Sequence, residues 1–382
     1  MEAALKKVFG SSRKICDWSP GTEMGFHIGM PVTSTDDAST YLITNYNGAG
    51  KRAEDSDYYI LRALDEGGDV PLWQALRATT AAPYFFAPQE IEGKTYQDGG
   101  IVEYNNPAAL ACAETAVIFP ETPLPSIVAS FGTGSAGPKR ETMASRSLKS
   151  KGQLGTRRVT KSRKQVRGRK LSDRFASRIF QAFLSQGDSN RAWKQLLSKR
   201  EVHGSGGFFR FDVQYEGSVP SLDSIADLDE MEEIAEECIT TSPALDKLAL
   251  CLRAHNFYFE LDKEPEYVDG QYECTGNIYC LLESDSEERE VFFSSLHHSS
   301  SVFQVCSRTV PGDFLASTDT RLDDEFSRNI KFSVPERQTP FEITLKEGAE
   351  DACGISGSPF TIDQLVKVQK LDAWFGTGDH RQ

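Results

Sequence analysis

The chain has 382 residues, of which 39% are hydrophobic, and a formal net charge of −14 at pH 7. This length is enough for two or three ordinary domains with a substantial core. No apolar run is long enough to cross a bilayer and the first residues lack the apolar segment of a secretory signal, so we expect a soluble, cytoplasmic protein. The eight cysteines show no Cys-x-x-Cys spacing, which predicts reduced thiols and neither a disulfide framework nor a zinc site.

Short helices and strands alternate through the first third of the chain. Turn signals and apolar periodicity predict, in order, a helix over residues 3–9, strands over 26–33 and 40–45, an apolar stretch over 58–64, and a helix over 70–78. A further helix is expected to begin at Asn106 and Pro107, with Asn106 as its N-cap, and an apolar strand follows over 126–131. This order of elements indicates an α/β unit with a buried sheet.

Asp98, Gly99 and Gly100 follow the aromatic side chain of Tyr96. An acidic residue before two glycines is typical of a strand that ends in a tight turn, because glycine accepts backbone angles that other residues avoid. The Asp98 carboxylate is then expected at a sheet edge, where a carboxylate serves as a base or as an orienting group. Taken alone, such a tripeptide is more often a surface turn, so the interpretation depends on the neighbouring motifs.

Positive charge is concentrated in residues 139–170, which contain thirteen Lys and Arg and one acid. The net charge of this segment is therefore +12, and its Ser- and Gly-rich composition with few apolar residues predicts a disordered insertion. Two interpretations stay open, namely a polybasic tether to anionic lipid headgroups or RNA and a solvated basic loop. No aromatic residue lies among the basic ones, which argues against nucleic-acid binding by base stacking.

Apolar periodicity predicts helices over residues 172–255, beyond the basic segment. From residue 256 onward the pattern changes to short strand-like runs separated by turn residues. The runs cover 257–261, 277–282, 291–293, 302–305, 330–334 and 341–345. They predict a β-rich C-terminal domain over 256–382, and its sequence indicates no particular function.

Four short motifs follow one another along the chain, at residues 73–85, Asp98–Gly100, Asn105–Pro107 and Ser130–Gly134. In their order and spacing they resemble the C-terminal half of the patatin-like phospholipase domain, and they are most similar to the fungal members of that family. The resemblance implies a three-layer α/β core with a central, mostly parallel sheet that is incomplete at its N-terminal side. The implied domains are residues 1–138 for the second half of the catalytic domain, 139–171 for the basic insertion, 172–255 for its helical completion and 256–382 for the β-rich part.

In that family a serine in a Gly-x-Ser-x-Gly elbow pairs with the aspartate of an Asp-Gly-Gly or Asp-Gly-Ala motif, and a Gly-rich loop forms the oxyanion hole. The resemblance therefore implies that Asp98 is the proton acceptor of a Ser–Asp dyad. The other residues that it implies are Gly99 and Gly100 within the motif, and Asn105, Asn106 and Pro107 as its support. The implied substrate is a membrane phospholipid or a neutral lipid, hydrolysed through acyl transfer to serine without a cofactor.

The 382 residues contain no serine in a Gly-x-Ser-x-Gly context, so no nucleophile is assigned. Ser135 lacks the first glycine of the elbow, Ser356 lacks the second, and both are expected in loops. The Gly-rich stretch 204–210 follows Asp98 in the sequence, whereas the oxyanion loop of the family precedes the aspartate. We therefore expect this chain to be inactive, as a fragment of a longer gene product or a degenerate copy. The alternatives are a non-catalytic lipid- or protein-binding module and an assembly in which another chain supplies the serine.

Histidine chemistry is not indicated by the pattern. His27 is expected on the face of a strand, and neither His203 nor His255 has a serine in an elbow context with which to form a triad. His297 and His298 are adjacent, so on a strand they would point to opposite sides, and no carboxylate cluster accompanies them. We therefore predict neither a Ser–His–Asp triad nor a metal site.

Overall fold

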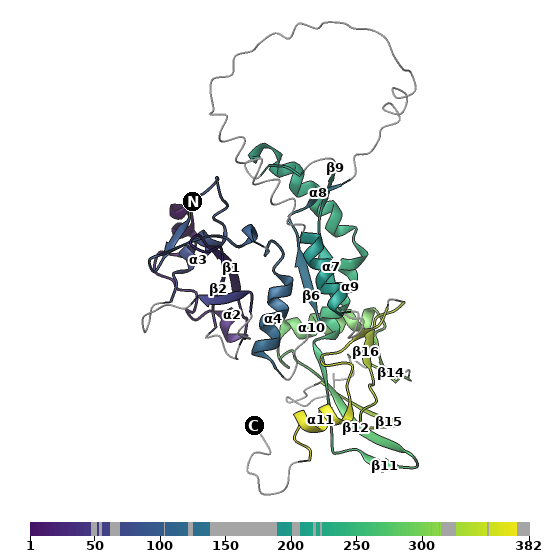
Figure 1. Ribbon diagram of the computed structural model, residues 1–382. Helices are drawn as coiled ribbons and strands as arrows, with labels where there is room; N and C mark the ends of the chain where they lie inside the picture. Colours follow the sequence, from purple (N-terminus) through teal and green to yellow (C-terminus); the bar gives the residue numbers. More distant parts are fainter. Residues whose placement is uncertain are drawn as a thin grey trace, which may run out of the picture. The chain divides into compact units, whose positions relative to one another are not determined.

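The computed structural model describes residues 1–46, 52, 56–61, 69–102, 104–120, 125–137, 189–200, 207–216, 219–221, 224–306, 308–312, 314, 326–349 and 351–372 (Figure 1). Its contacts divide the chain into two compact units. The first comprises Met1–Pro125, Ser130–Ser205 and Arg210–Ser224, and the second comprises Ser126–Ala129, Gly206–Phe209 and Ile225–Gln382. The basic segment 139–170 lies outside the described residues, so its disorder stays a prediction, as do the four domain boundaries.

The first unit contains a mixed sheet whose five described strands are ordered β3-β2-β1-β5-β4 (Figure 1). The strands are β1 (Gly29–Ser34), β2 (Thr40–Thr44), β3 (Tyr58–Leu61), β4 (Gln89–Ile91) and β5 (Lys94–Asp98). The pair β2 and β3 is parallel, and the other neighbours are antiparallel. The predicted α/β architecture is confirmed, although this sheet is mixed where the resemblance implies mostly parallel strands. Short connections such as residues 35–39 explain the difference, because they join neighbouring strands as antiparallel hairpins.

Helix α3 (Leu72–Thr79) packs small side chains against this sheet. Its Ala75 and Ala78 are fully buried in one core cluster with Val32 of β1 and Tyr96 of β5. Alanine has no side chain beyond Cβ, so the helix backbone can approach the strands closely. The helix therefore supports β1 and β5, and β5 is the strand that ends at Asp98.

In the described chain before residue 224, further helices and two pairs of short strands lie outside the five-stranded sheet. The other described helices before residue 224 are α1 (Glu2–Phe9), α2 (Pro20–Glu23), η1 (Gly99–Ile101), α4 (Ala108–Ile118) and α7 (Ser189–Arg200). The strands are β6 (Val128–Phe131), which pairs with β8 (Phe208–Phe211), and β7 (Ser135–Gly137), which pairs in parallel with β9 (Gln214–Glu216). Ser135, predicted in a loop, therefore lies in a strand. No helix of the described ranges combines the length and apolar character that a membrane span requires.

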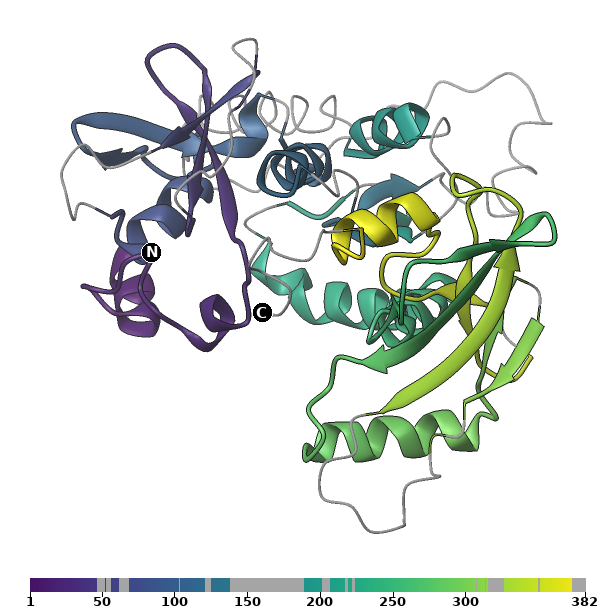
Figure 2. The same ribbon diagram turned by 90° about the horizontal axis from the view of Figure 1, so that it is seen from below.

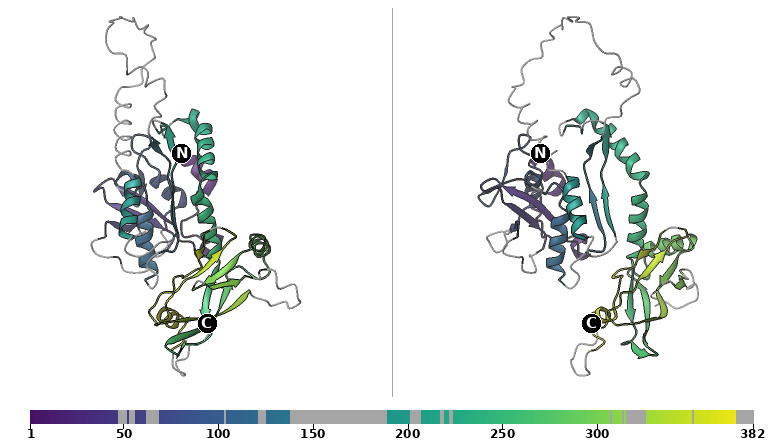
Figure 3. Two further views of the ribbon diagram at one scale, coloured as in Figure 1. Left: turned by 90° about the vertical axis from the view of Figure 1, so that its right-hand side faces the viewer. Right: turned by 45° about the vertical axis from the view of Figure 1, so that its right-hand side comes forward.

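The second unit is rich in β-structure, which confirms the predicted β-rich C-terminal region. One sheet has the order β10-β12-β11 with β15 also paired to β12, and the other has the order β14-β13-β16-β17 (Figure 2). The strands are β10 (Phe257–Leu261), β11 (Glu266–Val268), β12 (Gln271–Cys280), β13 (Val302–Val305), β14 (Arg308–Pro311), β15 (Ser327–Val334), β16 (Ile343–Lys346) and β17 (Cys353–Gly354). The described helices are η2 (Ile225–Asp227), α8 (Leu228–Thr240), α9 (Pro243–Ala254), α10 (Glu287–His298) and α11 (Ile362–Val368), with α8 and α9 visible from two sides in Figure 3.

Both sheets of the second unit contribute aromatic side chains to one core. Phe257 of β10 and Phe303 of β13 are fully buried, and their ring centroids lie 5.0 Å apart in an edge-to-face arrangement. Along β15, Ile330, Phe332 and Val334 alternate with exposed residues, as expected for a strand with one face in the core. Period-two patterning therefore predicts these strands well.

The predicted strand over residues 291–293 is wrong, because these residues lie within helix α10. Ser286 caps the helix by accepting a hydrogen bond from the backbone N–H of Arg289 at 3.2 Å, and acidic residues fill the first turn. Phe293 and Leu296, three positions apart, both face the core. His297 and His298 therefore lie in the last helical turn and not on a strand.

The expectation of reduced thiols is also wrong for one pair of cysteines. Cys251 of α9 and Cys353 of β17 form a disulfide, with their Cα atoms 5.4 Å apart. The two residues are separated by 102 positions in the sequence, and only the folded second unit brings them together. A sequence without paired cysteine spacing gives no sign of such a bond.

Candidate functional site

Asp98 is the last residue of β5, directly before the 3-10 turn η1. Its Oδ1 accepts a hydrogen bond from the backbone N–H of Gly100 at 2.8 Å, which fixes the carboxylate on the turn. Its backbone carbonyl accepts a hydrogen bond from Thr33 Oγ1 at 3.1 Å, and Val32 of β1 is its partner in the sheet register. The structure thus places the side chain at a strand end, as its Asp-Gly-Gly context predicts.

The half-buried position of Asp98 affects its acidity. Burial raises the pKa of the carboxyl group above its ordinary value of 3.8, and the hydrogen bond from Gly100 lowers it by less. No Lys or Arg forms an ion pair with Asp98 in the part of the chain that the structure describes. The carboxylate is therefore a stronger base than an exposed, ion-paired aspartate.

Gly99 lies directly against the backbone of β1. A Cβ atom added at this position would lie 2.5 Å from the carbonyl oxygen of Pro31 and 2.7 Å from its carbonyl carbon. The same Pro31 oxygen accepts a hydrogen bond of 2.8 Å from Thr79 Oγ1 of α3, which limits how far it can move. Close approach of the turn to β1 therefore requires glycine at position 99.

The substitution Gly99→Ala is expected to lower the free energy of unfolding by about 1–3 kcal/mol, because the added methyl group must displace backbone atoms. Chemical denaturation of both proteins measures the change. Gly29→Ala is the matched control, since its three nearest atoms would be side-chain atoms of Leu42, at 3.2 Å or more, and not backbone. An unchanged midpoint for Gly99→Ala would contradict the tight packing of this turn.

The predicted supporting residues lie at the start of α4. Asn106 is 4% exposed, and its Oδ1 accepts hydrogen bonds of 3.1 Å from the backbone N–H of Ala108 and from Ser130 Oγ. The helix begins at Ala108, one residue later than predicted, and Pro107 occupies the N-cap position. Asn105 lies beside the turn, with its Cα 3.7 Å from where a Cβ of Gly100 would stand. These residues thus connect the Asp98 turn to α4 and β6.

A buried polar cluster joins β6 to the strand β8, and only part of it could be anticipated. Arg210 Nη1 donates a hydrogen bond of 2.8 Å to Ser130 Oγ, and Arg210 Nη2 lies 3.6 Å from Asp212 Oδ1. The same Asp212 oxygen accepts the backbone N–H of Gly134 at 3.0 Å. Arg210 and Asp212 are the functional-site neighbours that sequence reasoning missed. Arg210 alternates with Phe209 and Phe211 along β8, and Asp212 directly follows the strand; this alternation is the signal that indicates a polar face there.

Glu114 anchors α4 to the rest of the first unit. The residue is 5% exposed, and its carboxylate accepts hydrogen bonds from Arg52 Nε at 2.7 Å, Arg52 Nη2 at 2.6 Å, Tyr46 Oη at 2.6 Å and Tyr58 Oη. Burial raises the pKa of Glu114, but these hydrogen bonds and the Arg52 charge lower it more, so it lies below its ordinary value of 4.5. The same burial and the Glu114 charge raise the pKa of Tyr46 and of Tyr58. A charged Glu114 therefore fixes the helix that follows the Asp98 turn.

The histidines form no triad in the described part of the chain. His27 stacks edge-on against Tyr46 and Phe119 with centroids 5.3 and 5.8 Å apart, and His255 Nδ1 lies 2.8 Å from the carbonyl oxygen of Cys251. His203 lies outside the described residues. Where side chains are described, no group of three or more His, Cys, Asp or Glu has the arrangement of a metal site.

Comparison with known proteins identifies the region around Asp98. The family model described as patatin-like phospholipase matches residues 32–112, which contain the second half of β1, strands β2 to β5, α3, Asp98 and the start of α4. The chain is 48% identical to the calcium-independent phospholipase A2-gamma of Rattus norvegicus over 68 residues, 18% of this chain and 8% of that protein. It is 43% identical to the protein of that name in Homo sapiens over 86 residues, 22% of this chain and 11% of that protein.

A plant protein matches a longer segment at lower identity. The chain is 31% identical to Phospholipase A I of Arabidopsis thaliana over 115 residues, 29% of this chain and 8% of that protein. The matched segment thus spans about a tenth of the length of each of these relatives. Residues 32–112 therefore belong to a patatin-like phospholipase domain.

Proposed function

We propose that Asp98 is the proton acceptor of a Ser–Asp dyad in a lipid acyl hydrolase whose substrate is a membrane phospholipid or a neutral lipid. The observation that carries this proposal is the half-buried carboxylate at the end of β5, held by the Gly100 N–H within the region that matches the phospholipase family. Its Oδ2 accepts no hydrogen bond within the described ranges, so this oxygen is free to take a proton. The region needs no cofactor for this chemistry.

The reaction divides into two acyl-transfer steps, in each of which Asp98 takes up a proton and gives it back. In the first, a serine hydroxyl gives its proton to the carboxylate while its oxygen attacks the ester carbonyl and the alcohol leaves with that proton. In the second, a water molecule gives a proton to Asp98 while its oxygen attacks the carbonyl of the acyl-serine, and the fatty acid is released as Asp98 returns that proton to the serine oxygen. Burial supports both transfers, because it raises the pKa of Asp98 and so increases its affinity for the proton.

The serine of this dyad is proposed to come from polypeptide other than these 382 residues, because they contain no Gly-x-Ser-x-Gly sequence. By itself the 382-residue chain is then expected to hydrolyse no ester. The same observation favours the second candidate function, a non-catalytic lipid- or protein-binding module. In that case the basic segment 139–170 would bind an anionic membrane from the cytoplasm, with an affinity that falls as salt is added.

A covalent serine-hydrolase probe tests the proposal. The 382-residue chain and the longest translation product of its gene are each treated with a fluorophosphonate and assayed on a short-chain fatty acid ester. We expect labelling and hydrolysis from a product that carries the serine elbow, and neither from the 382-residue chain. If the longest product has no elbow and no activity but binds anionic vesicles, the binding-module function replaces the hydrolase.

A further inference from the structure

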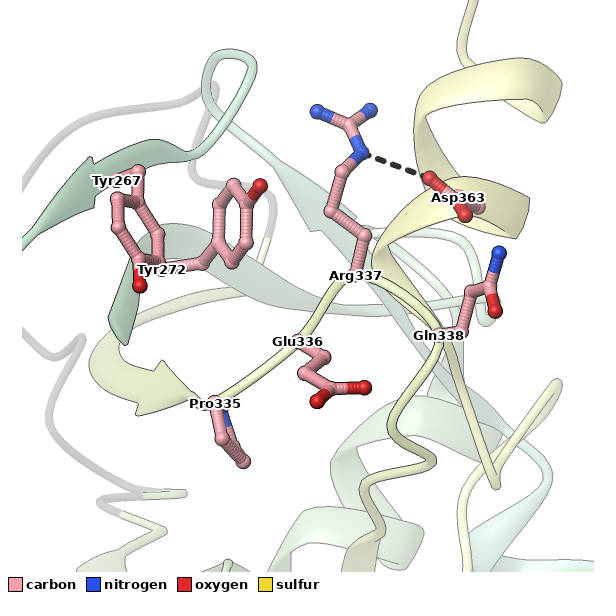
Figure 4. A pocket seen from close by; sticks show the side chains of 7 residues that line it. All are labelled: Tyr267, Tyr272, Pro335, Glu336, Arg337, Gln338 and Asp363. Carbon is pink, nitrogen blue, oxygen red and sulfur yellow. Dashed lines mark hydrogen bonds and ion pairs between the residues drawn. The ribbon is translucent and has the colours of Figure 1, made fainter. Parts of the chain in front are cut away.

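The second unit carries a surface pocket of about 400 Å³ beside the hairpin of β11 and β12 (Figure 4). It is lined by Tyr267, Tyr272, Pro335, Glu336, Arg337, Gln338 and Asp363. Volumes of this order are typical of sites for small molecules. Its lining combines two aromatic rings with carboxylates, which distinguishes it from an ordinary apolar groove.

Two tyrosines form one wall of the pocket. The ring centroids of Tyr267 and Tyr272 lie 4.9 Å apart with their planes at 58°, and Tyr267 is 63% exposed. The negative face of an aromatic ring attracts a cation, and this contact is strongest for cations with weakly held water. The Arg337 guanidinium lies 5.9 Å from the Tyr272 ring centroid, so the unit already uses one ring in this way. The exposed ring of Tyr267 remains available.

The charges around the pocket favour a positive ligand. Arg337 donates from Nε to Asp363 at 2.7 Å and from Nη1 to Glu264 at 2.9 Å, so two carboxylates already surround its charge. Glu336 joins Asp363 as the second carboxylate of the lining and forms no ion pair with a described residue, while Glu264 lies outside the lining. With three carboxylates against one guanidinium, the local potential repels anions and attracts cations.

We propose that this pocket binds a small quaternary ammonium ion of the choline type. The trimethylammonium group would lie against the exposed Tyr267 ring, with its charge balanced by Glu336. A primary ammonium ion fits less well, because it must give up its strong hydration on entering an aromatic site, whereas a trimethylammonium ion holds water weakly. This inference concerns the second unit alone and does not depend on the activity proposed for Asp98.

Ligand-observed NMR on the complete 382-residue chain tests the inference with matched probes. We expect choline to bind at least about fivefold more tightly than 3,3-dimethyl-1-butanol, its uncharged isostere, because the isostere lacks the attraction to the rings and to Glu336. Glycerophosphocholine is expected to bind less tightly than choline, and phosphocholine least of all, because each added negative charge faces the same carboxylates. Equal binding of choline and its isostere, or no binding of either, would overturn the proposal.

Variants of the lining locate the binding. Glu336→Gln and Tyr267→Ala are each expected to weaken choline binding about three- to tenfold, and Tyr267→Phe is expected to retain it because the ring is kept. Glu260→Gln, an exposed carboxylate on β10, is the charge-matched control and should leave binding unchanged. Thermal unfolding of each variant shows whether the fold is intact. Unchanged binding in folded Glu336→Gln and Tyr267→Ala would reject the site.

Discussion

Asp98→Asn is expected to lower kcat for ester hydrolysis by about 10³-fold or more in a polypeptide that joins these residues to the proposed serine. An amide does not accept a proton near neutral pH, so the serine hydroxyl keeps its hydrogen. The fold should survive, because the side-chain oxygen of the introduced asparagine can still accept the Gly100 N–H that now lies 2.8 Å from Asp98 Oδ1. Steady-state kinetics on a soluble ester and denaturant unfolding measure the two effects separately.

Asp98→Ala serves as the comparison for this experiment. It removes the acceptor of the Gly100 N–H as well as the base, so the free energy of unfolding should fall by about 1 kcal/mol in addition to the loss of activity. In the parent protein, activity should decline as the pH falls through the pKa of Asp98, which burial holds above 3.8, because the protonated carboxyl cannot act as a base. An Asp98→Asn enzyme with more than a tenth of the parent kcat would exclude Asp98 as the base.

Glu114→Gln is expected to cost about 3–5 kcal/mol of stability, because it leaves the guanidinium of Arg52 buried without its counter-charge. Arg52 and Glu114 side chains are 13% and 6% exposed, so water can replace little of the lost interaction. Urea denaturation of the variant and the parent measures the difference. Tyr58→Phe is the control, since it deletes one hydrogen bond to Glu114 and keeps the ion pair, and about 1 kcal/mol is expected.

The pH dependence of stability follows from the same carboxylate. The pKa of Glu114 in the folded protein lies below its ordinary value of 4.5, so its stabilising contribution is complete above that pH. As the pH falls from 4.5 through the lower folded pKa, the contribution is lost. The parent should therefore lose more stability than Glu114→Gln over this acidic range, and parallel curves would show that Glu114 is not the group responsible.

Local sequence patterns predict the Asp98 turn well, because the structure there depends on neighbouring residues. Gly99 and Gly100 directly follow the strand, and the Asn106 side chain bonds to a backbone N–H two residues ahead. The alternation of apolar and polar residues along β15 likewise predicts which side chains are buried. In each case the interacting groups lie within a few positions of one another, so the pattern contains most of the required information.

Interactions between distant residues could not be predicted in the same way. Arg210 reaches Ser130 across 80 positions, and no short motif records that contact. The strand predicted over residues 291–293 fails for a different reason. Val291, Phe292 and Phe293 have high strand propensity. The N-cap at Ser286 and the helical spacing of Phe293 and Leu296 nevertheless favour a helix. A three-residue window is too short to register either signal.

The disulfide between Cys251 and Cys353 determines what proteolytic cleavage of the second unit would release. Strands β10 to β16 all lie between the two cysteines, so this part of the chain is a covalently closed ring of backbone and sulfur. A single cleavage of the backbone anywhere within the ring opens it without releasing a fragment. The cut protein would keep its full mass on a non-reducing gel and separate into two pieces once the disulfide is reduced.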